Sequence, residues 1–149
     1  MGLQNVKVKI KNLSKFELPK QLTEEAAGFD LRANIAENVT LKSLERAVIP
    51  TGLYIELPVG YEAQVRPRSG LAAKNGISLA NCVGTIDSDY RGEIKVILIN
   101  LSNEDFVVED SMRIAQMVIS RVPKVEWLEE EKLSETERGD GGFGHSGLK

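Results

Sequence analysis

The chain has 149 residues, a formal net charge of −3 and a single cysteine, Cys82. A chain of this length forms about one ordinary domain, which can fold without a metal or a disulfide. The negative charge argues against a protein that coats a nucleic acid, because such binding needs clustered positive charge. A lone cysteine excludes an intrachain disulfide and favours a reducing compartment, so we expect a cytoplasmic protein.

The sequence predicts neither an export signal nor a membrane anchor. Near the amino terminus Lys7, Lys9 and Lys11 alternate with apolar residues and interrupt the apolar core that a signal peptide needs. Elsewhere no apolar run approaches the roughly 20 residues that span a bilayer. We therefore expect neither a membrane nor a nucleic acid among the partners of this chain.

Short apolar or alternating segments follow one another between turn signals, and each predicts a strand. In chain order they cover residues 6–10, 39–41, 47–49, 52–57, 61–65, 77–79, 93–101, 106–108 and 114–122. The connections are too short for parallel strands joined by helices, so an all-β barrel or double-sheet roll is favoured. One short helix is predicted over residues 70–74, with Ser69 as its N-cap and Gly76 as the left-handed residue that ends it.

The last part of the chain changes in composition. Residues 126–137 contain six glutamates and one lysine, and residues 138–147 contain five glycines. We predict a core over residues 1–125, a solvated acidic linker over residues 126–137 and a flexible glycine-rich arm over residues 138–149. The chain shows no internal repeat and no second domain.

The arm contains a formal G-x-G-x-x-G pattern, which does not predict dinucleotide binding because no strand precedes it and no helix has room to follow it. Its glycines let successive backbone N–H groups turn toward phosphate oxygens, and Arg138 adds a positive charge. Phe143 offers a face on which a base can stack. The alternative is a disordered tail.

Residues 66–72 also suit an anionic ligand. Ser69 would begin a helix whose free N–H groups lie beside Arg68, and both features favour an anion. An ordinary capped helix after a turn is the alternative.

Two weaker segments place polar side chains in apolar surroundings. Residues 113–119 carry Arg113 and Gln116 on a strand-like run, and residues 27–33 carry the carboxylate of Asp30. That carboxylate would order the waters around a magnesium ion, which usually keeps several of them. The alternative is an aspartate in a surface loop.

Residues 81–92 are interpreted as a long hairpin with an unusual choice of side chains. Asn81 carries a donor and an acceptor that suit the edge of a pyrimidine. Asp87 can hold a water as a general base, and Tyr90 can pack on a sugar. Asp, Ser and Gly are also ordinary turn residues, so a plain turn is the alternative.

Taken in this order, the five segments resemble the five motifs of the trimeric dUTP diphosphatase family, over residues 27–147. The resemblance implies a homotrimer of jelly-roll-like, distorted β-barrel subunits, with active sites at the subunit interfaces and the flexible arm closing over them. The implied activity is hydrolysis of dUTP to dUMP and diphosphate with Mg²⁺ as cofactor. Such an activity keeps uracil out of DNA and supplies dUMP for thymidylate synthesis.

The resemblance also implies a role for each matching residue. Asp87 would activate the water that attacks the α-phosphate, Arg138 would contact the terminal phosphate like an arginine finger, and Asp30 would contact the metal through water. Tyr90 would pack on deoxyribose and exclude a ribose 2′-hydroxyl, and Phe143 would stack on uracil. The other residues implied to bind substrate are Arg68, Ser69, Gly70, Asn81, Gly84, Thr85, Ile86, Lys95, Arg113, Gln116, Gly144, His145 and Ser146.

Two other functions fit parts of the pattern. A dCTP deaminase shares the fold, but it needs a carboxylate that faces the base from the strand after the hairpin. Here that strand has Ile97 at the position concerned and Glu93 comes too early, which disfavours deamination. The second alternative is a regulatory protein that uses nucleotide-dependent closure of the arm to control a protein partner. Such relatives often carry an inserted segment, and this compact chain shows no obvious one.

Overall fold

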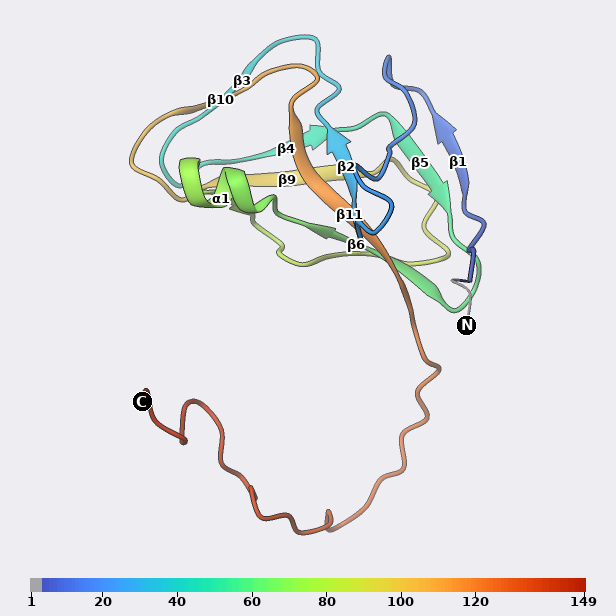
Figure 1. Cartoon of the computed structure of the whole chain (residues 1–149), viewed down its shortest axis with the longest axis vertical. Helices are drawn as coiled ribbons and strands as arrows, with labels where there is room; N and C mark the ends of the chain where they lie inside the picture. The colour runs from blue at the N-terminus through green and yellow to red at the C-terminus, as the bar shows by residue number, and fades with distance from the viewer. Residues whose placement is uncertain (1–3) are drawn as a thin grey trace.

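Strands form where apolar and polar residues alternate, because successive side chains of a strand point to opposite faces of a sheet. The computed structural model describes residues 4–149 and shows these strands closed into an all-β, jelly-roll-like barrel (Figure 1). In chain order the elements are β1 (Lys9–Asn12), β2 (Phe29–Arg32), β3 (Val39–Leu41), β4 (Arg46–Pro50), β5 (Leu53–Glu56), β6 (Tyr61–Arg66), α1 (Ser69–Asn75), β7 (Ile77–Leu79), β8 (Gly84–Ile86), β9 (Lys95–Asn100), β10 (Phe106–Val108) and β11 (Arg113–Arg121). The expected fold class is confirmed.

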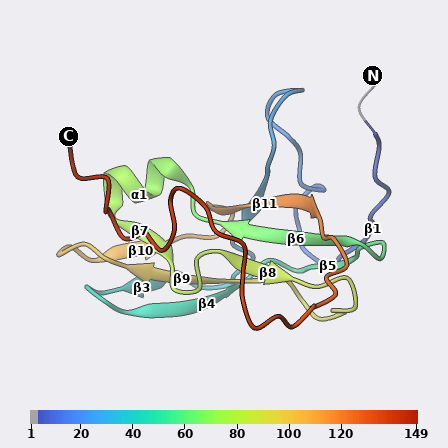
Figure 2. The same cartoon turned by 90° about the horizontal axis from the view of Figure 1, so that it is seen from below.

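Within the described residues the strands pair antiparallel in four sheets. The largest sheet has the order β2-β11-β6-β8, and the next has the order β4-β9-β7. Two smaller sheets pair β1 with β5 and β3 with β10. Figure 2 shows β6 and β11 in one layer and β3, β4 and β9 in the layer beneath it.

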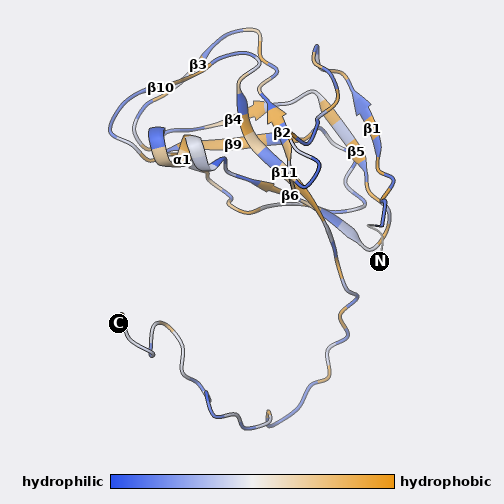
Figure 3. Cartoon of the chain, in the orientation of Figure 1, coloured by the Kyte–Doolittle hydropathy of each residue, from blue (hydrophilic) through white to orange (hydrophobic). Residues whose placement is uncertain are grey.

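Apolar side chains from both layers form one buried cluster between them. Leu31 and Ile114 of the upper layer and Ile49 and Leu98 of the lower layer belong to it, each at most 1% exposed. Figure 3 shows hydrophobic residues concentrated on β2, β4 and β9. Because burial of one such side chain contributes about 1.5–3 kcal/mol, this cluster supplies the main stabilisation of the barrel.

Asn100 is fully buried in this core although it is polar. Its Nδ2 donates to the carbonyls of Leu41 at 2.8 Å and Glu104 at 2.7 Å, and its Oδ1 accepts from the backbone N–H and the hydroxyl of Ser102. A buried polar group costs little when all of its atoms have partners. Asn100 therefore fixes the turn that follows β9 to strand β3.

The single predicted helix is present as α1, but it begins differently from the prediction. Ser69 is its first helical residue rather than its N-cap; Arg68 occupies the N-cap position and makes no side-chain capping hydrogen bond. The predicted end is confirmed, because Gly76 is left-handed at φ 66° and its N–H bonds the carbonyls of Leu71 and Ala72. The correction places Ser69 on the helix itself, with its own N–H among the free groups of the first turn.

Beyond β11, residues 122–149 form no strand or helix and lead away from the barrel in a long curve (Figure 1). Large apolar side chains on this extension are exposed, including Trp127 at 90%, Leu133 at 88% and Phe143. Within residues 4–149, no helix has the length and apolar character needed to cross a membrane. An extension that exposes a tryptophan suits a segment that packs against another molecule.

Candidate active site

Three of the five sequence segments meet in the largest sheet. Strand β11 lies between β2 and β6, and its register places Gln116 opposite both Asp30 of β2 and Arg66 of β6. Arg68 and the start of α1 follow directly after β6. The sheet therefore brings residues from three distant parts of the chain to one place.

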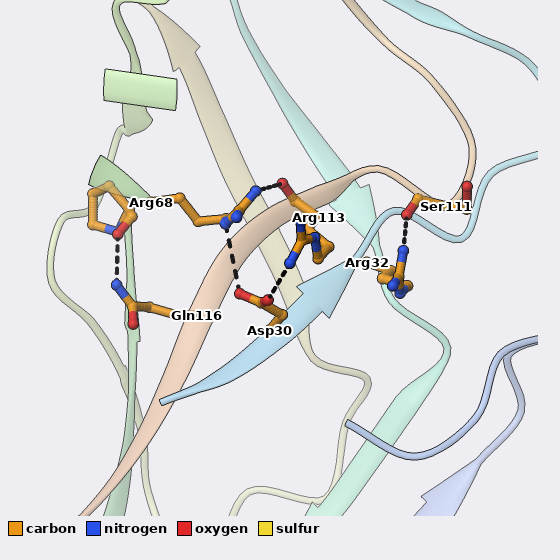
Figure 4. Close-up of polar contacts among 7 residues, drawn as sticks. Asp30, Arg32, Arg68, Ser111, Arg113 and Gln116 are labelled. Carbon is orange, nitrogen blue, oxygen red and sulfur yellow. Dashed lines mark hydrogen bonds and ion pairs between the residues drawn. The ribbon is translucent and has the colours of Figure 1, made fainter. Parts of the chain in front are cut away.

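Asp30 is the centre of this cluster (Figure 4). Its Oδ1 lies 3.5 Å from Nε of Arg68 and its Oδ2 lies 3.1 Å from Nη1 of Arg113. Nη1 of Arg68 also donates to the backbone carbonyl of Arg113 at 3.1 Å. The Asp30 side chain is 18% exposed, so these pairs are better shielded from solvent than surface ion pairs. One carboxylate thus holds two arginine side chains side by side, and we define these three residues as the Asp30 cluster.

Gln116 is held beside the Asp30 cluster by two neighbours. Its Nε2 donates to the carbonyl of Pro67 at 3.1 Å. On its other side a Cβ on Gly28 would lie only 2.6 Å from its Oε1, so Gly28 leaves the space that this carboxamide occupies. Ser69 and Gly70, at the exposed start of α1, complete the group. Their backbone N–H groups lack partners within a helix, which suits them to donate to phosphate oxygens.

The fourth segment is a hairpin that connects the two main sheets. Strands β7 and β9 pair with each other, as the hairpin interpretation requires, but the connection between them contains β8, which pairs with β6 of the other sheet. A cleft of about 220 Å³ lies along this connection. Its lining includes all of the residues predicted in this part of the chain: Asn81, Gly84, Thr85, Ile86, Asp87, Tyr90 and Lys95.

Two larger cavities are less suited to a nucleotide base. One, of about 480 Å³, is lined mainly by residues 14–22, with Asp30 and Arg113 of the Asp30 cluster also in its lining. The other, of about 610 Å³, is largely apolar and lies between β1, β5 and β11. The smaller cleft combines an amide side chain, a carboxylate and an aromatic ring on the connection that the sequence singles out, and such groups orient a polar ligand.

Within the cleft, Asp87 follows directly after β8 and is exposed. Its carboxylate takes part in no ion pair within residues 4–149. The ring of Tyr90 is 46% exposed, and its hydroxyl donates to the carbonyl of Glu93 at 3.0 Å. Asp87 is therefore free to bind a water, whereas Tyr90 is already held in place.

The structure does not bring all of the predicted residues together in one chain. The cleft contains no residue of the Asp30 cluster and neither Ser69 nor Gln116. On the arm, Arg138, Gly144, His145 and Ser146 line a shallow recess of their own, and Nε of Arg138 donates to the carbonyl of Gly141. The fully exposed side chain of Phe143 also lies on the arm. The candidate residues therefore form three separate groups.

Sequence reasoning missed three residues that shape these groups. Gly28 leaves space for Gln116, Gly92 lies under the ring of Tyr90, and Glu93 supplies the carbonyl that binds this tyrosine. All three lie within or beside the predicted segments. Their roles depend on contacts made only after folding, so no sequence pattern indicates them.

Paired arginines beside an exposed helix start, together with a small cleft that contains an amide and a carboxylate, are typical of a protein that binds a small phosphorylated molecule. The comparisons with known proteins specify it further. The family model for dUTPase matches residues 14–147. The chain therefore belongs to the dUTPase family.

The individual relatives agree with this assignment. The deoxyuridine 5'-triphosphate nucleotidohydrolase of Fusobacterium nucleatum subsp. nucleatum is 55% identical over 145 residues, covering 97% of this chain and 99% of its own length. That of Rickettsia bellii is 58% identical over 143 residues, covering 95% of each. The solved structure of Staphylococcus bacteriophage 80alpha dUTPase with dUpNHpp has a TM-score of 0.84 at 29% identity, covering 95% of this chain and 99% of that one.

Proposed function

We propose that this enzyme hydrolyses dUTP to dUMP and diphosphate, with Asp87 as the general base. Membership of the dUTPase family and relatives that are more than half identical over nearly the whole chain support the substrate and the products. The free, exposed carboxylate of Asp87 in the polar cleft supports its role as the base. Asp87 accepts a proton from water as the water oxygen attacks the α-phosphorus. The bond from this phosphorus to the bridging oxygen then breaks, and diphosphate leaves.

The cleft binds the base and the sugar in this proposal. Asn81 supplies the donor and acceptor that read the uracil edge, while Gly84, Thr85, Ile86 and Lys95 line the same cleft. Tyr90 packs on deoxyribose. The small volume of the cleft supports selection by size, because a thymine methyl group or a ribose hydroxyl needs additional space.

In the same proposal, the triphosphate binds beside the Asp30 cluster, at the start of α1. Arg68, Gln116 and the first backbone N–H groups of α1, at Ser69 and Gly70, hold its oxygens. Arg113 is a substrate-binding residue in the same way, and its guanidinium also donates to Asp30. From the arm, Arg138 contacts the terminal phosphate and Phe143 stacks on uracil, with Gly144, His145 and Ser146 contributing further contacts.

Magnesium is the metal in this proposal, and the residues fit it. No group of three or more His, Cys, Asp or Glu side chains within residues 4–149 is placed to hold a metal, so most of its ligands come from the nucleotide and water. A carboxylate has about four lone-pair sites, so Asp30 can order metal-bound waters while it holds two arginines. When bound, Mg²⁺ neutralises the charge that develops on the leaving diphosphate.

A substitution at Gly28 tests the phosphate end of the site. In Gly28→Ala the new methyl group would lie 2.6 Å from Gln116 Oε1 and would displace the carboxamide from Pro67. A displaced Gln116 would lose its proposed hydrogen bond to a phosphate oxygen. Loss of one hydrogen bond to a charged group costs about 1.5–3 kcal/mol, so we expect KM for dUTP to rise roughly tenfold or more. Steady-state kinetics of this variant and of Gln116→Ala check it. An unchanged KM in Gly28→Ala, with a raised KM in Gln116→Ala, would contradict the steric role of Gly28.

We further propose that the enzyme is a homotrimer with active sites at the subunit interfaces. The cleft and the Asp30 cluster share no residue, which supports a site built from two subunits. Val48, 57% exposed, lies directly opposite Ile97, and both side chains line the cleft. Exposed apolar side chains at this place suit a cleft that a second copy completes.

The domain division and the location belong to the same proposal. The barrel of residues 1–125 carries the cleft and the residues that bind the phosphates. The linker of residues 126–137 reaches a neighbouring subunit, and the arm of residues 138–149 closes the site of that subunit. A cytoplasmic location is supported by Cys82, an exposed free thiol that suits a reducing compartment.

Parallel assays of dUTP, dCTP, dTTP and UTP with Mg²⁺, with the products identified by chromatography, test the activity. We expect diphosphate release from dUTP alone, with dUMP as the other product. Conversion of dCTP to dUTP would instead support deamination, which is disfavoured because Ile97 in the cleft lining is apolar and the carboxylate of Glu93, in the same lining, is bound to the backbone N–H of Gly52. Absence of turnover would leave the nucleotide-dependent regulatory role as the better account.

A further inference from the structure

The ring of Tyr90 lies directly against the backbone of Gly92. A Cβ on Gly92 would be 2.3 Å from the Tyr90 hydroxyl oxygen, 2.5 Å from Cζ and 2.9 Å from Cε2. Gly92 is not among the glycines with positive φ, so its backbone conformation is open to any residue. The glycine is therefore needed for space, and that space is filled by the tyrosine ring.

A hydrogen bond fixes the other end of the same ring. The Tyr90 hydroxyl donates to the carbonyl of Glu93 at 3.0 Å. Because a hydrogen bond depends on both distance and direction, this carbonyl determines the tilt of the ring as well as its position.

The Glu93 carbonyl is itself held by the turn between β4 and β5. The Glu93 carboxylate accepts from the backbone N–H of Gly52 at 2.9 Å. The next residue, Ile94, donates its N–H to the carbonyl of Leu53 at 2.8 Å and accepts at its own carbonyl from the hydroxyl of Thr51 at 2.5 Å. Thr51 and Ile94 are both 2% exposed. Three hydrogen bonds thus connect residues 93–94 to the turn between β4 and β5.

We propose that Gly92 and Glu93 are positioning residues that set the selectivity of the enzyme for deoxyribose over ribose by fixing the ring of Tyr90. The inference rests on the proposed packing of Tyr90 against the sugar. Gly92 allows the ring to lie close to the backbone, and Glu93 links it to the turn at residues 51–53. A ring displaced from this position leaves room beside the sugar for a 2′-hydroxyl.

The ratio of kcat/KM for dUTP to that for UTP measures this selectivity. A pocket that packs closely discriminates about 100-fold against a substrate with an added hydroxyl. We therefore expect Gly92→Ala to lower the dUTP-to-UTP ratio about tenfold or more. Glu93→Ala should lower it as well, because it loses the bond to Gly52. Glu93→Gln should restore most of it, since an amide oxygen still accepts from that N–H. Glu109→Ala, an exposed glutamate outside the site, is the matched control.

A second set of variants separates positioning of Tyr90 from a general effect on the fold. Tyr90→Ala should lower the ratio, and adding Gly92→Ala or Glu93→Ala to it should lower the ratio no further. Thermal unfolding of each variant shows whether it remains folded. If Gly92→Ala and Glu93→Ala reduce kcat/KM equally for both nucleotides while Tyr90→Ala changes the ratio, the positioning role is overturned. If Tyr90→Ala itself leaves the ratio unchanged, the sugar-facing role of Tyr90 and this inference both fail.

Discussion

Deletion of residues 138–149 is expected to leave a folded protein that hydrolyses dUTP at least about 10³-fold more slowly, the smaller of the effects typical of an arginine finger. The buried core ends within β11, and the backbone hydrogen bonds of the arm stay within residues 136–147. The deletion therefore removes Arg138 and Phe143 without removing a core contact. Turnover measured at saturating dUTP, with circular dichroism as the check of folding, gives the result. A truncated enzyme with ordinary turnover would show that the arm takes no part in the reaction.

A mixing experiment tests whether the arm acts on a neighbouring subunit. Full-length Asp87→Asn keeps the arm but lacks the base, and the truncated chain keeps the base but lacks the arm. Each alone should be nearly inactive. Chains unfolded together and refolded as mixed assemblies should regain activity if, as proposed, the arm of one chain serves the base of another. Mixed assemblies as inactive as their components would contradict sites shared between subunits.

Asp87→Asn is expected to lower kcat for dUTP by about 10²–10⁴, the contribution of a positioned general base. Asparagine has nearly the same shape but cannot accept a proton from water, so binding of the nucleotide should persist. Calorimetric titration with dUTP in the presence of Mg²⁺ measures that binding. Asp89→Asn, an exposed aspartate in the same hairpin outside the cleft lining, is the matched control. Loss of nucleotide binding in Asp87→Asn would point instead to a structural role for this carboxylate.

Much of the fold could be predicted because the strands are short and their alternation is regular. The segments at residues 39–41, 77–79 and 106–108 coincide with β3, β7 and β10. The first predicted strand, residues 6–10, is displaced to Lys9–Asn12, where β1 pairs with β5. Its alternating pattern continues past residue 10, so the pattern alone could not determine which part would find a partner.

Strands β2 and β8 were not predicted, and both contribute to the site. β2 carries the charged residues Asp30 and Arg32, which make its sequence pattern less typical of a strand. β8 has only three residues and begins with a glycine. Each forms because a neighbouring strand supplies hydrogen bonds, β11 for β2 and β6 for β8. Tertiary pairing of this kind overrides local propensity.

The candidate site was found from sequence as a set of segments, and the family resemblance that they suggested is confirmed. The sequence could not show how the segments divide in space. Asp30 and Arg113 are 83 positions apart, yet they meet because β2 and β11 are neighbours. The pairing of Arg68 and Arg113 with Asp30 likewise results from the order of strands in the sheet, and no local sequence motif encodes this pairing.

The placement of β8 has a consequence for how the enzyme moves during turnover. The strands before and after β8 in the chain, β7 and β9, belong to one sheet and β8 belongs to the other, so the connection that carries Asp87 is joined to both sheets. Displacing it would break the β6 ladder and expose the buried Ile86. Amide protons of residues 84–86 should therefore exchange with solvent on the timescale of the core rather than that of a loop. Substrate then meets a rigid surface, and adaptation to it must come from the carboxyl-terminal arm.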